Sequence, residues 1–230
     1  DIIGISKTGS GKTAAFGIPI LEKIEHKKGI QVLIMTPTRE LAVQIAKVLK
    51  EFGENIHPKI TSIYGGVAIN PQMDKLRTAE IVVGTPGRLL DHLQRRTIDL
   101  SRLKCVVLDE ADKMVEMGFI EDIERILSAT PKDRQVVLFG ATISEEVEYL
   151  KGKFMRNPKY AKAEVHVEKD FLEQYYYNVE HNQKFSLLVH LLKKEESDRV
   201  MIFCSARHTV ESVTKNLRAH AIKAEMIHGK

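Results

Sequence analysis

Short apolar runs that alternate with helical patterns are the feature of this sequence that most restricts its fold. Between the runs, stretches such as 38–51 and 120–128 carry apolar residues three and four positions apart, which is the helical period. Nearly continuous apolar strands separated by helices predict a parallel α/β sheet that is covered on both faces. The predicted strands are 2–6, 31–36, 60–64, 80–84, 105–109 and 135–140.

The alternation resumes in the last quarter of the chain. Strands are expected at 174–179, 199–205 and 224–227, with helices at 183–194 and 208–220. Between the two regions, Asn157-Pro158 is a natural stop for a helix expected at 144–155. We therefore expect a first domain at 1–158, a linker at 159–173 and a partial second domain at 174–230. Both ends fall in or beside strand-like runs, so the sequence is treated as a fragment.

Composition narrows the class of protein without identifying it. Lys and Arg number 35 against 31 Asp and Glu, and this slight excess permits a polyanionic partner without requiring one. Cys105 and Cys204 are too far apart to suggest a disulfide framework or a metal motif. We therefore expect a soluble monomer in the reducing cytoplasm, with neither a membrane span nor a signal peptide.

A glycine-containing segment separates the first apolar run from a helical pattern. Strand, glycine loop and helix in this order predict a phosphate site, because loop amides and the helix N-terminus attract anions. Lys12 is expected to reach the β- and γ-phosphates of ATP, and the Thr13 hydroxyl to ligate Mg²⁺. A simple flexible turn would not need this Lys-Thr pair. The expected ATP-binding residues are Thr8, Gly9, Ser10, Gly11, Lys12 and Thr13.

The apolar run at 105–108 ends in acidic residues. The carboxyl edge of a parallel sheet is where ligands bind in open α/β folds, so these carboxylates are candidates for the same site. Asp109 fits the strand-end carboxylate that holds Mg²⁺, and Glu110 fits the residue that orients or deprotonates the attacking water. The alternative is the acidic first turn of an ordinary helix.

The motif Asp109-Glu110-Ala111-Asp112 resembles that of the DEAD-box RNA helicases, and so do further motifs along the whole chain. The resemblance implies an α/β fold: a RecA-like P-loop parallel sheet flanked by helices, followed by a truncated second RecA-like lobe. It also implies that ATP, Mg²⁺ and RNA bind between the lobes. The matching motifs are GSGKT at 9–13, PTREL at 37–41, Gly65-Gly66, TPGR at 85–88, ATI at 141–143, MIFC at 201–204 and IHG at 227–229.

The resemblance also implies roles for individual residues. Lys12, Asp109 and Glu110 would be catalytic, with Thr13 and Asp109 serving the metal. A second group, Asp112, Ala141 and Thr142, would couple the nucleotide state to RNA. The implied activity is RNA-stimulated ATP hydrolysis that separates short RNA duplexes without sequence preference. The implied RNA contacts are Pro37, Thr38, Arg39, Gly65, Gly66, Thr85, Pro86, Gly87 and Arg88.

The candidate RNA residues are also of types that can bind an RNA backbone. Arginines, hydroxyls, main-chain amides and helix N-termini hold an RNA backbone independently of sequence. Both Thr-Pro elements follow a predicted strand and precede a predicted helix, so the alternative is ordinary helix capping by Thr38 and Thr85.

The chain departs from the family pattern at two places. Ser6-Lys7-Thr8 stands where the family commonly has Ala-Gln-Thr, and Gly140 replaces the serine of a Ser-Ala-Thr motif. The upstream glutamine motif and the later arginine motifs of the second lobe do not occur in this stretch. By itself, it is therefore expected to hydrolyse ATP weakly or not at all.

Two other functions fit parts of the same pattern. One is an ATP-dependent RNA clamp or assembly platform with little unwinding. The other is a P-loop ATPase that acts on DNA or on protein partners, because a fold alone does not determine a function. Sequence does not identify the RNA target or accessory proteins.

Overall fold

The computed structural model describes residues 1–6, 9–162, 173–194 and 197–229. The chain divides into two compact units, Asp1–Glu168 and Lys169–Lys230. Each unit is described by itself below.

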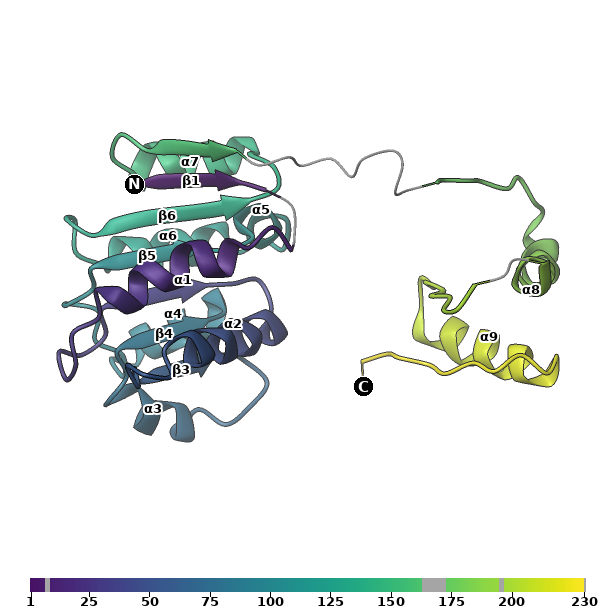
Figure 1. The fold of residues 1–230 in the computed structure, drawn as a ribbon, viewed down its shortest axis with the longest axis horizontal. Helices are drawn as coiled ribbons and strands as arrows, with labels where there is room; N and C mark the ends of the chain where they lie inside the picture. Colours follow the sequence, from purple (N-terminus) through teal and green to yellow (C-terminus); the bar gives the residue numbers. More distant parts are fainter. Residues whose placement is uncertain (7–8, 163–172, 195–196, 230) are drawn as a thin grey trace. The chain divides into compact units, whose positions relative to one another are not determined.

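The first unit is built on a seven-stranded sheet in which all strand pairs are parallel (Figure 1). The order across the sheet is β3-β4-β2-β5-β6-β1-β7, so β3 and β7 are the edge strands. This confirms the predicted parallel α/β sheet. The strands are β1 (Ile2–Ile5), β2 (Val32–Met35), β3 (Ile60–Ile63), β4 (Ile81–Gly84), β5 (Cys105–Leu108), β6 (Gln135–Gly140) and β7 (Lys159–Lys162).

Helices connect the strands and cover both faces of the sheet (Figure 1). Capping explains where several begin: the Thr38 hydroxyl accepts a hydrogen bond from the Leu41 amide, and the Ser144 hydroxyl accepts one from Val147. The helices are α1 (Lys12–Glu22), α2 (Arg39–Phe52), α3 (Asn70–Leu76), α4 (Pro86–Gln94), α5 (Ala111–Glu116), α6 (Ile120–Ser128) and α7 (Glu145–Phe154).

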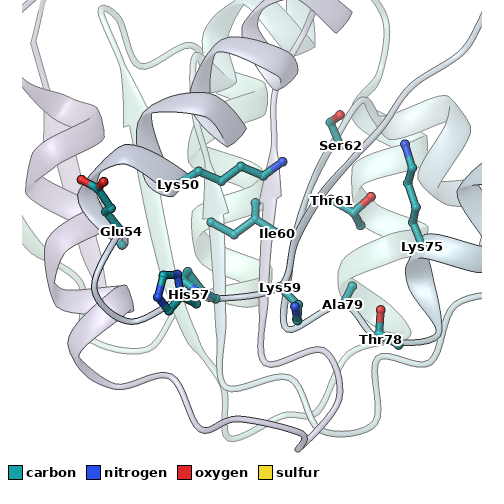
Figure 2. Close-up of a pocket in the computed structure, with 12 residues that line it drawn as sticks. Lys50, Glu54, His57, Lys59, Ile60, Thr61, Ser62, Lys75, Thr78 and Ala79 are labelled. Atoms are coloured by element: carbon teal, nitrogen blue, oxygen red, sulfur yellow. The ribbon is translucent and has the colours of Figure 1, made fainter.

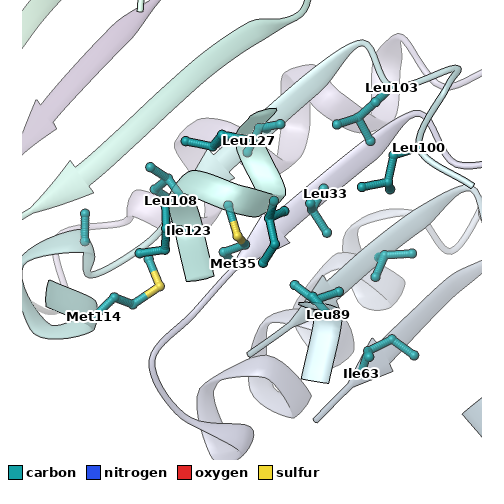
Figure 3. Packing of buried hydrophobic residues seen from close by; sticks show 14 of the residues in the cluster. Leu33, Met35, Ile63, Leu89, Leu100, Leu103, Leu108, Met114, Ile123 and Leu127 are labelled. Atoms are coloured by element: carbon teal, nitrogen blue, oxygen red, sulfur yellow. The ribbon is translucent and has the colours of Figure 1, made fainter. Parts of the chain in front are cut away.

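The core consists of two apolar clusters, one on each face of the sheet. Side chains along a strand alternate between faces, so Leu33 and Met35 of β2 enter one cluster while Val32 and Ile34 enter the other. The first cluster packs against α4 to α7, and Figure 3 shows its central residues. The second packs against α1 and α2. Burial on both faces explains why these strands are continuously apolar.

The sheet has one strand that the sequence analysis did not predict. β7 pairs in parallel with β1, with Ile2 opposite Lys159 and Ile5 opposite Lys162, inside the stretch expected to be a linker. The first unit therefore extends beyond residue 158. The strand was missed because all four of its residues are exposed, so it carries no apolar run. Residues 163–172 of the predicted linker lie outside the described residues.

In the second unit the predicted helices form but the predicted strands do not. The helices are the 3₁₀ turn η2 (His181–Gln183), α8 (Lys184–Lys194) and α9 (Arg207–Ala219). The strands expected at 174–179, 199–205 and 224–227 are irregular. Phe203 and Ile227, which those strands were expected to bury, are 89% and 93% exposed. Strands need hydrogen-bonded neighbours, and none of these segments pairs with another within the described part of this unit.

Within the part of the chain that the structure describes, every helix is too short or too polar to cross a lipid bilayer.

A buried carboxylate joins three segments at the amino end of the sheet. Glu80, which is 2% exposed, accepts hydrogen bonds from the amides of Lys27 (2.8 Å) and Lys59 (2.9 Å), and it lies 3.2 Å from Nδ1 of His26. Burial pushes the pKa of Glu80 upward, but the two amide hydrogen bonds and His26 outweigh burial and lower it. The ionised carboxylate is therefore a structural element of the fold.

We expect Glu80→Ala to lower the free energy of unfolding by about 2–4 kcal/mol, because the amides of Lys27 and Lys59 lose a buried acceptor. The pKa of Glu80 is lower in the folded protein than in the unfolded chain, so the ionised carboxylate stabilises the fold at any pH above the ordinary glutamate pKa. This stabilisation is lost as the pH falls through the lower pKa of the folded protein. Urea unfolding should therefore show the two proteins converging below about pH 4. The control is Glu116→Ala, at an exposed position; an equal loss there, or a difference independent of pH, would contradict the assignment.

Candidate nucleotide and RNA site

Strand order divides the predicted site residues into two groups along the carboxyl edge of the sheet. The glycine loop follows β1, Asp109 follows β5, and Gly140 ends β6; these strands are neighbours in the order β5-β6-β1. The strands that precede the candidate RNA elements are β2, β3 and β4, and they are neighbours in the order β3-β4-β2. One half of the edge therefore carries the candidate nucleotide residues, and the other half carries the candidate RNA residues.

The glycine loop curls between β1 and α1. Gly9 and Gly11 have positive φ angles of 82° and 85°, and beyond the adjoining residues no atom of the described residues lies within 4 Å of the point where a Cβ would stand on either glycine. Ser10 donates a hydrogen bond from its hydroxyl to the hydroxyl of Ser6 at 2.9 Å, which closes the loop where the usual P-loop pattern has glycine. Thr8 lies outside the described residues. In its described part, the loop therefore has the left-handed glycines and the space beside them that a phosphate cradle needs.

Lys12 and Thr13 are the first two residues of α1. The Nζ of Lys12 donates to the backbone oxygen of Ser6 at 3.4 Å, so the side chain folds back over the loop. Both residues are only partly exposed. Because the loop amides and the positive end of the helix dipole lie at the same point, this corner of the unit favours an anion.

Asp109 follows β5 and is 3% exposed. Its amide donates to the backbone oxygen of Met35 at 2.9 Å, which holds the residue in line with the sheet. Burial raises the pKa of Asp109 to about 6, whereas the positive charge of Lys12 acts in the opposite direction. The loop that leads to Lys12 and the strand end that leads to Asp109 lie on either side of β6, although the two residues are far apart in the sequence.

Glu110 has a backbone conformation that is unusual for a residue with a side chain. It lies at the N-cap of α5 with φ 54° and ψ 49°, in the left-handed region. Non-glycine residues in this region cost roughly 1–3 kcal/mol and cluster at functional sites. Its carboxylate forms an ion pair with Lys113 at 3.0 Å. The residue follows Asp109 directly, and its side chain makes no helix-capping hydrogen bond.

Asp112 connects the ends of two neighbouring strands. One of its carboxylate oxygens accepts hydrogen bonds from the amide of Ala141 (2.9 Å), the amide of Thr142 (3.0 Å) and the Thr142 hydroxyl (3.2 Å). The residues that the resemblance assigned to coupling are therefore brought together by direct contacts. A Cβ at Gly140 would stand 3.3 Å from the same carboxylate and 3.0 Å from the backbone oxygen of Thr142.

On the other half of the edge, the loops after β2 and β3 meet. Arg39 is exposed, and its guanidinium carbon lies 5.4 Å from the centre of the Tyr64 ring. Gly65 and Gly66 are exposed, and a Cβ on Gly66, where φ is 79°, would stand 3.5 Å from Nη1 of Arg39. The neighbouring residues differ in exposure: Thr38 is exposed, whereas Pro37 is buried.

The segment after β4 contains accessible residues and one residue, Arg88, whose side chain supports a neighbouring loop. Thr85 is the N-cap of α4 without a side-chain capping bond, so helix capping accounts for Thr38 but not for Thr85. Pro86 is buried and Gly87 is exposed. The Arg88 side chain is 13% exposed and donates to the backbone oxygen of Val67 at 3.0 Å. Arg88 therefore braces the loop that follows Gly65-Gly66.

Two side chains that the sequence analysis did not single out help to shape the site. Ser6 supports the glycine loop through its hydroxyl and its backbone oxygen, and Tyr64 lies under the guanidinium of Arg39. Ser6 had been noted only as a departure from a motif. Tyr64 carries no motif, and only its place at the end of a predicted strand could have drawn attention to it.

Comparisons with known proteins agree with this geometry. The family model for DEAD/DEAH box helicases matches residues 1–150. The chain is 43% identical over 229 residues to the probable ATP-dependent RNA helicase MJ0669 of Methanocaldococcus jannaschii, with all of this chain and 61% of that protein covered. It is 41% identical over 232 residues to the DEAD-box ATP-dependent RNA helicase CshA of Streptococcus pneumoniae, covering 44% of that protein.

Two solved structures are similar to this chain in fold. A DEAD box protein from Methanococcus jannaschii matches with a TM-score of 0.70 at 43% identity, covering all of this chain and 62% of that one. A hypothetical ATP-dependent RNA helicase from Sulfolobus tokodaii matches with a TM-score of 0.66 at 36% identity, covering 94% of this chain and 62% of that one. The chain spans only part of the length of these relatives. With a RecA-like sheet, a glycine loop and a strand-end Asp-Glu-Ala-Asp at one edge, it belongs to the DEAD/DEAH box helicase family.

Proposed function

We propose that the protein is an ATP-dependent RNA helicase that binds an RNA backbone without sequence preference and couples ATP hydrolysis to local duplex separation. The observation that carries the proposal is the convergence of the β1 loop with Asp109 at the end of β5, on either side of β6. A glycine loop alone also fits a flexible turn, and an acidic strand end alone also fits an ordinary helix start. Their meeting at one corner is what a nucleoside triphosphate with Mg²⁺ requires.

The residues at this corner fit ATP and Mg²⁺ by their chemistry. The open space beside Gly9 and Gly11 gives phosphate oxygens access to main-chain amides, and Lys12 supplies a positive charge at the start of α1. Thr13 and Asp109 would ligate the metal; Mg²⁺ in nucleotide sites takes few protein ligands and keeps several waters. When bound, it supplies charge stabilisation to the phosphate oxygens. Glu110 would accept a proton from the attacking water.

RNA would bind on the other half of the same edge. Arg39 offers a charged group, Thr38 and Thr85 offer hydroxyls, and the exposed Gly65, Gly66 and Gly87 let phosphates approach the main chain. Such contacts hold the backbone and carry no sequence information. The Asp112 contacts to Ala141 and Thr142 tie the segment after β5 to the segment after β6 beside the candidate nucleotide residues, and in this proposal these three residues relay the nucleotide state to RNA.

A test of this function measures ATP and RNA dependence together. Phosphate release should rise when single-stranded RNA is added, and a short labelled RNA duplex with a single-stranded tail should separate only with ATP. Unlabelled DNA should compete poorly with RNA, because the 2′-hydroxyl distinguishes the two. Equal competition by DNA would reject the RNA assignment. Long-lived ATP-dependent RNA binding with little strand separation would favour the second candidate, an RNA clamp, which the glycine at position 140 supports.

Gly140→Ser is expected to increase the RNA duplex separated per ATP hydrolysed, about two- to tenfold, which is the effect of one hydrogen bond of roughly 0.5–1.5 kcal/mol. The new hydroxyl would stand beside Asp112, whose carboxylate already binds Ala141 and Thr142. The substitution also crowds the backbone oxygen of Thr142 at 3.0 Å, so that residue must shift slightly. Strand separation and phosphate release measured on the same samples give the ratio. Gly152→Ser, in open space on α7, is the control, and an unchanged ratio for Gly140→Ser would count against the role of this contact.

A further inference from the structure

A pocket lies away from the carboxyl edge, beside the edge strand β3. Its volume is about 570 Å³, and residues from β3, the end of α2, the end of α3 and the loop before β3 line it (Figure 2). Because α2 begins at Arg39 and ends beside the pocket, the pocket lies toward the opposite end of α2 from the candidate RNA residues. The lining residues that matter for its chemistry are Lys50, His57, Lys59, Thr61, Ser62 and Lys75.

The lining is positively charged. Lys50, Lys59 and Lys75 are exposed, and none of them forms an ion pair with the residues that the structure describes. Glu54 is the one acidic residue among the lining side chains. In Figure 2 the ammonium groups of Lys50 and Lys75 extend toward the part of the pocket where Ser62 lies. Three unpaired lysines against one carboxylate favour an anionic ligand.

One lining residue has a buried hydroxyl that lacks a hydrogen-bond partner among the described residues. Thr61 is 6% exposed, and its hydroxyl has no hydrogen-bond partner within the described ranges. A buried hydroxyl without a partner costs roughly 1–3 kcal/mol, and such groups are normally satisfied by protein, water or ligand. Charged residues commonly surround an edge strand to prevent pairing with other chains, and that role would explain the lysines. It does not explain the pocket or the unpaired hydroxyl at its wall.

We propose that this pocket binds phosphates of the RNA backbone and extends the RNA surface along β3. The proposal rests on the proposed function. β3 lines the pocket from Ile60 to Ser62 and ends next to Gly65-Gly66, so one strand connects the pocket with the candidate RNA loop. A strand of RNA held at the glycines therefore reaches the lysines by following one element.

The chemistry of the lining favours a phosphate backbone over an acidic peptide. Lysine binds phosphates as a point charge, and threonine and serine hydroxyls add hydrogen bonds to phosphate oxygens. The pocket is lined by lysines and hydroxyls without arginine. Its apolar lining residues, Pro58, Ile60 and Ala79, are buried and leave little surface for the apolar anchors of a docked peptide.

The test compares RNAs of two lengths in the presence of a nonhydrolysable ATP analogue. The triple variant Lys50→Gln, Lys59→Gln, Lys75→Gln should bind an oligouridylate of about 15 nucleotides roughly ten- to hundredfold more weakly, and one of about 6 nucleotides as the unchanged chain does. In a titration with salt, the slope of log affinity against log salt should fall by about 2, from about 0.7 for each of three lost phosphate contacts.

A matched control removes three positive charges from elsewhere on the same unit. Lys132→Gln, Lys159→Gln, Lys162→Gln changes exposed lysines, two of them on β7 at the opposite edge of the sheet. It should leave both affinities and the salt slope unchanged. If the pocket triple leaves the affinity and the salt slope of the long RNA unchanged, or matches the control, the inference is overturned while the proposed function stands.

Two further outcomes can be distinguished from a failure of the inference alone. If the unchanged chain binds neither RNA, the proposed function itself fails, and the inference fails with it. If fluorescent poly-glutamate binds the unchanged chain and not the pocket triple, while RNA binding is the same for both, the pocket takes an acidic peptide and the RNA assignment is wrong.

Discussion

Replacing Glu110 with glutamine is expected to lower the rate of RNA-stimulated ATP hydrolysis by about 10²- to 10⁴-fold, which is the usual contribution of a general base. Glutamine has the same shape but cannot accept the proton of the attacking water. The strained N-cap conformation of Glu110, with φ 54°, argues that its carboxylate is positioned for such a task. Single-turnover phosphate release with saturating RNA gives the rate, measured in a protein of the full length of the relatives that contains this chain.

The Glu110→Gln variant should still bind ATP and RNA. Glutamine keeps an oxygen that can accept the hydrogen bond from Lys113, so the start of α5 should be undisturbed. The affinity for a fluorescent ATP analogue and the melting temperature should therefore match those of the parent protein. Glu116→Gln, at the other end of α5, provides the comparison. Undiminished turnover in Glu110→Gln would remove Glu110 from the chemical step.

The second large effect is expected at Lys12, where Lys12→Ala should weaken ATP binding by about 10- to 150-fold. This range corresponds to the loss of one or two charge-assisted hydrogen bonds of roughly 1.5–3 kcal/mol in total. Fluorescence titration of this chain with an ATP analogue and Mg²⁺ measures the change directly and does not depend on turnover. Lys23→Ala, an exposed position just after α1, is the control. Equal affinity for Lys12→Ala and the parent would show that nucleotide binds elsewhere.

The effect of Lys12→Ala on the stability of the fold can be measured separately from its effect on ATP binding. The ammonium of Lys12 acts against the burial that raises the pKa of Asp109, so its removal leaves the buried Asp109 carboxylate with less compensation. Circular dichroism and a melting curve on the ligand-free variant check that it remains folded during the titration.

Local patterns were sufficient for most of the first unit because each strand and helix there is specified by its own residues. The β6 range 135–140 and the α6 range 120–128 follow directly from apolar runs and helical spacing. β7 was missed because its four residues are exposed and form no apolar run, and it is held by backbone pairing with β1. In the second unit, the apolar run at 201–204 predicts a strand that does not form, because pairing depends on a neighbour and not on the run itself.

By itself, the sequence determined the parallel α/β class, the motifs that carry the family, and the residue types at the site, because all three follow from short-range spacing. Only the tertiary structure decided which loops meet. Strand order brings Asp109, which follows β5, and the glycine loop, which follows β1, to either side of β6, and it gathers the loops after β2, β3 and β4 on the other half of the edge. It also forms the lysine pocket beside β3 from segments without a shared motif. Contacts between distant segments depend on how strands pair, and pairing is set by the packing of the whole sheet.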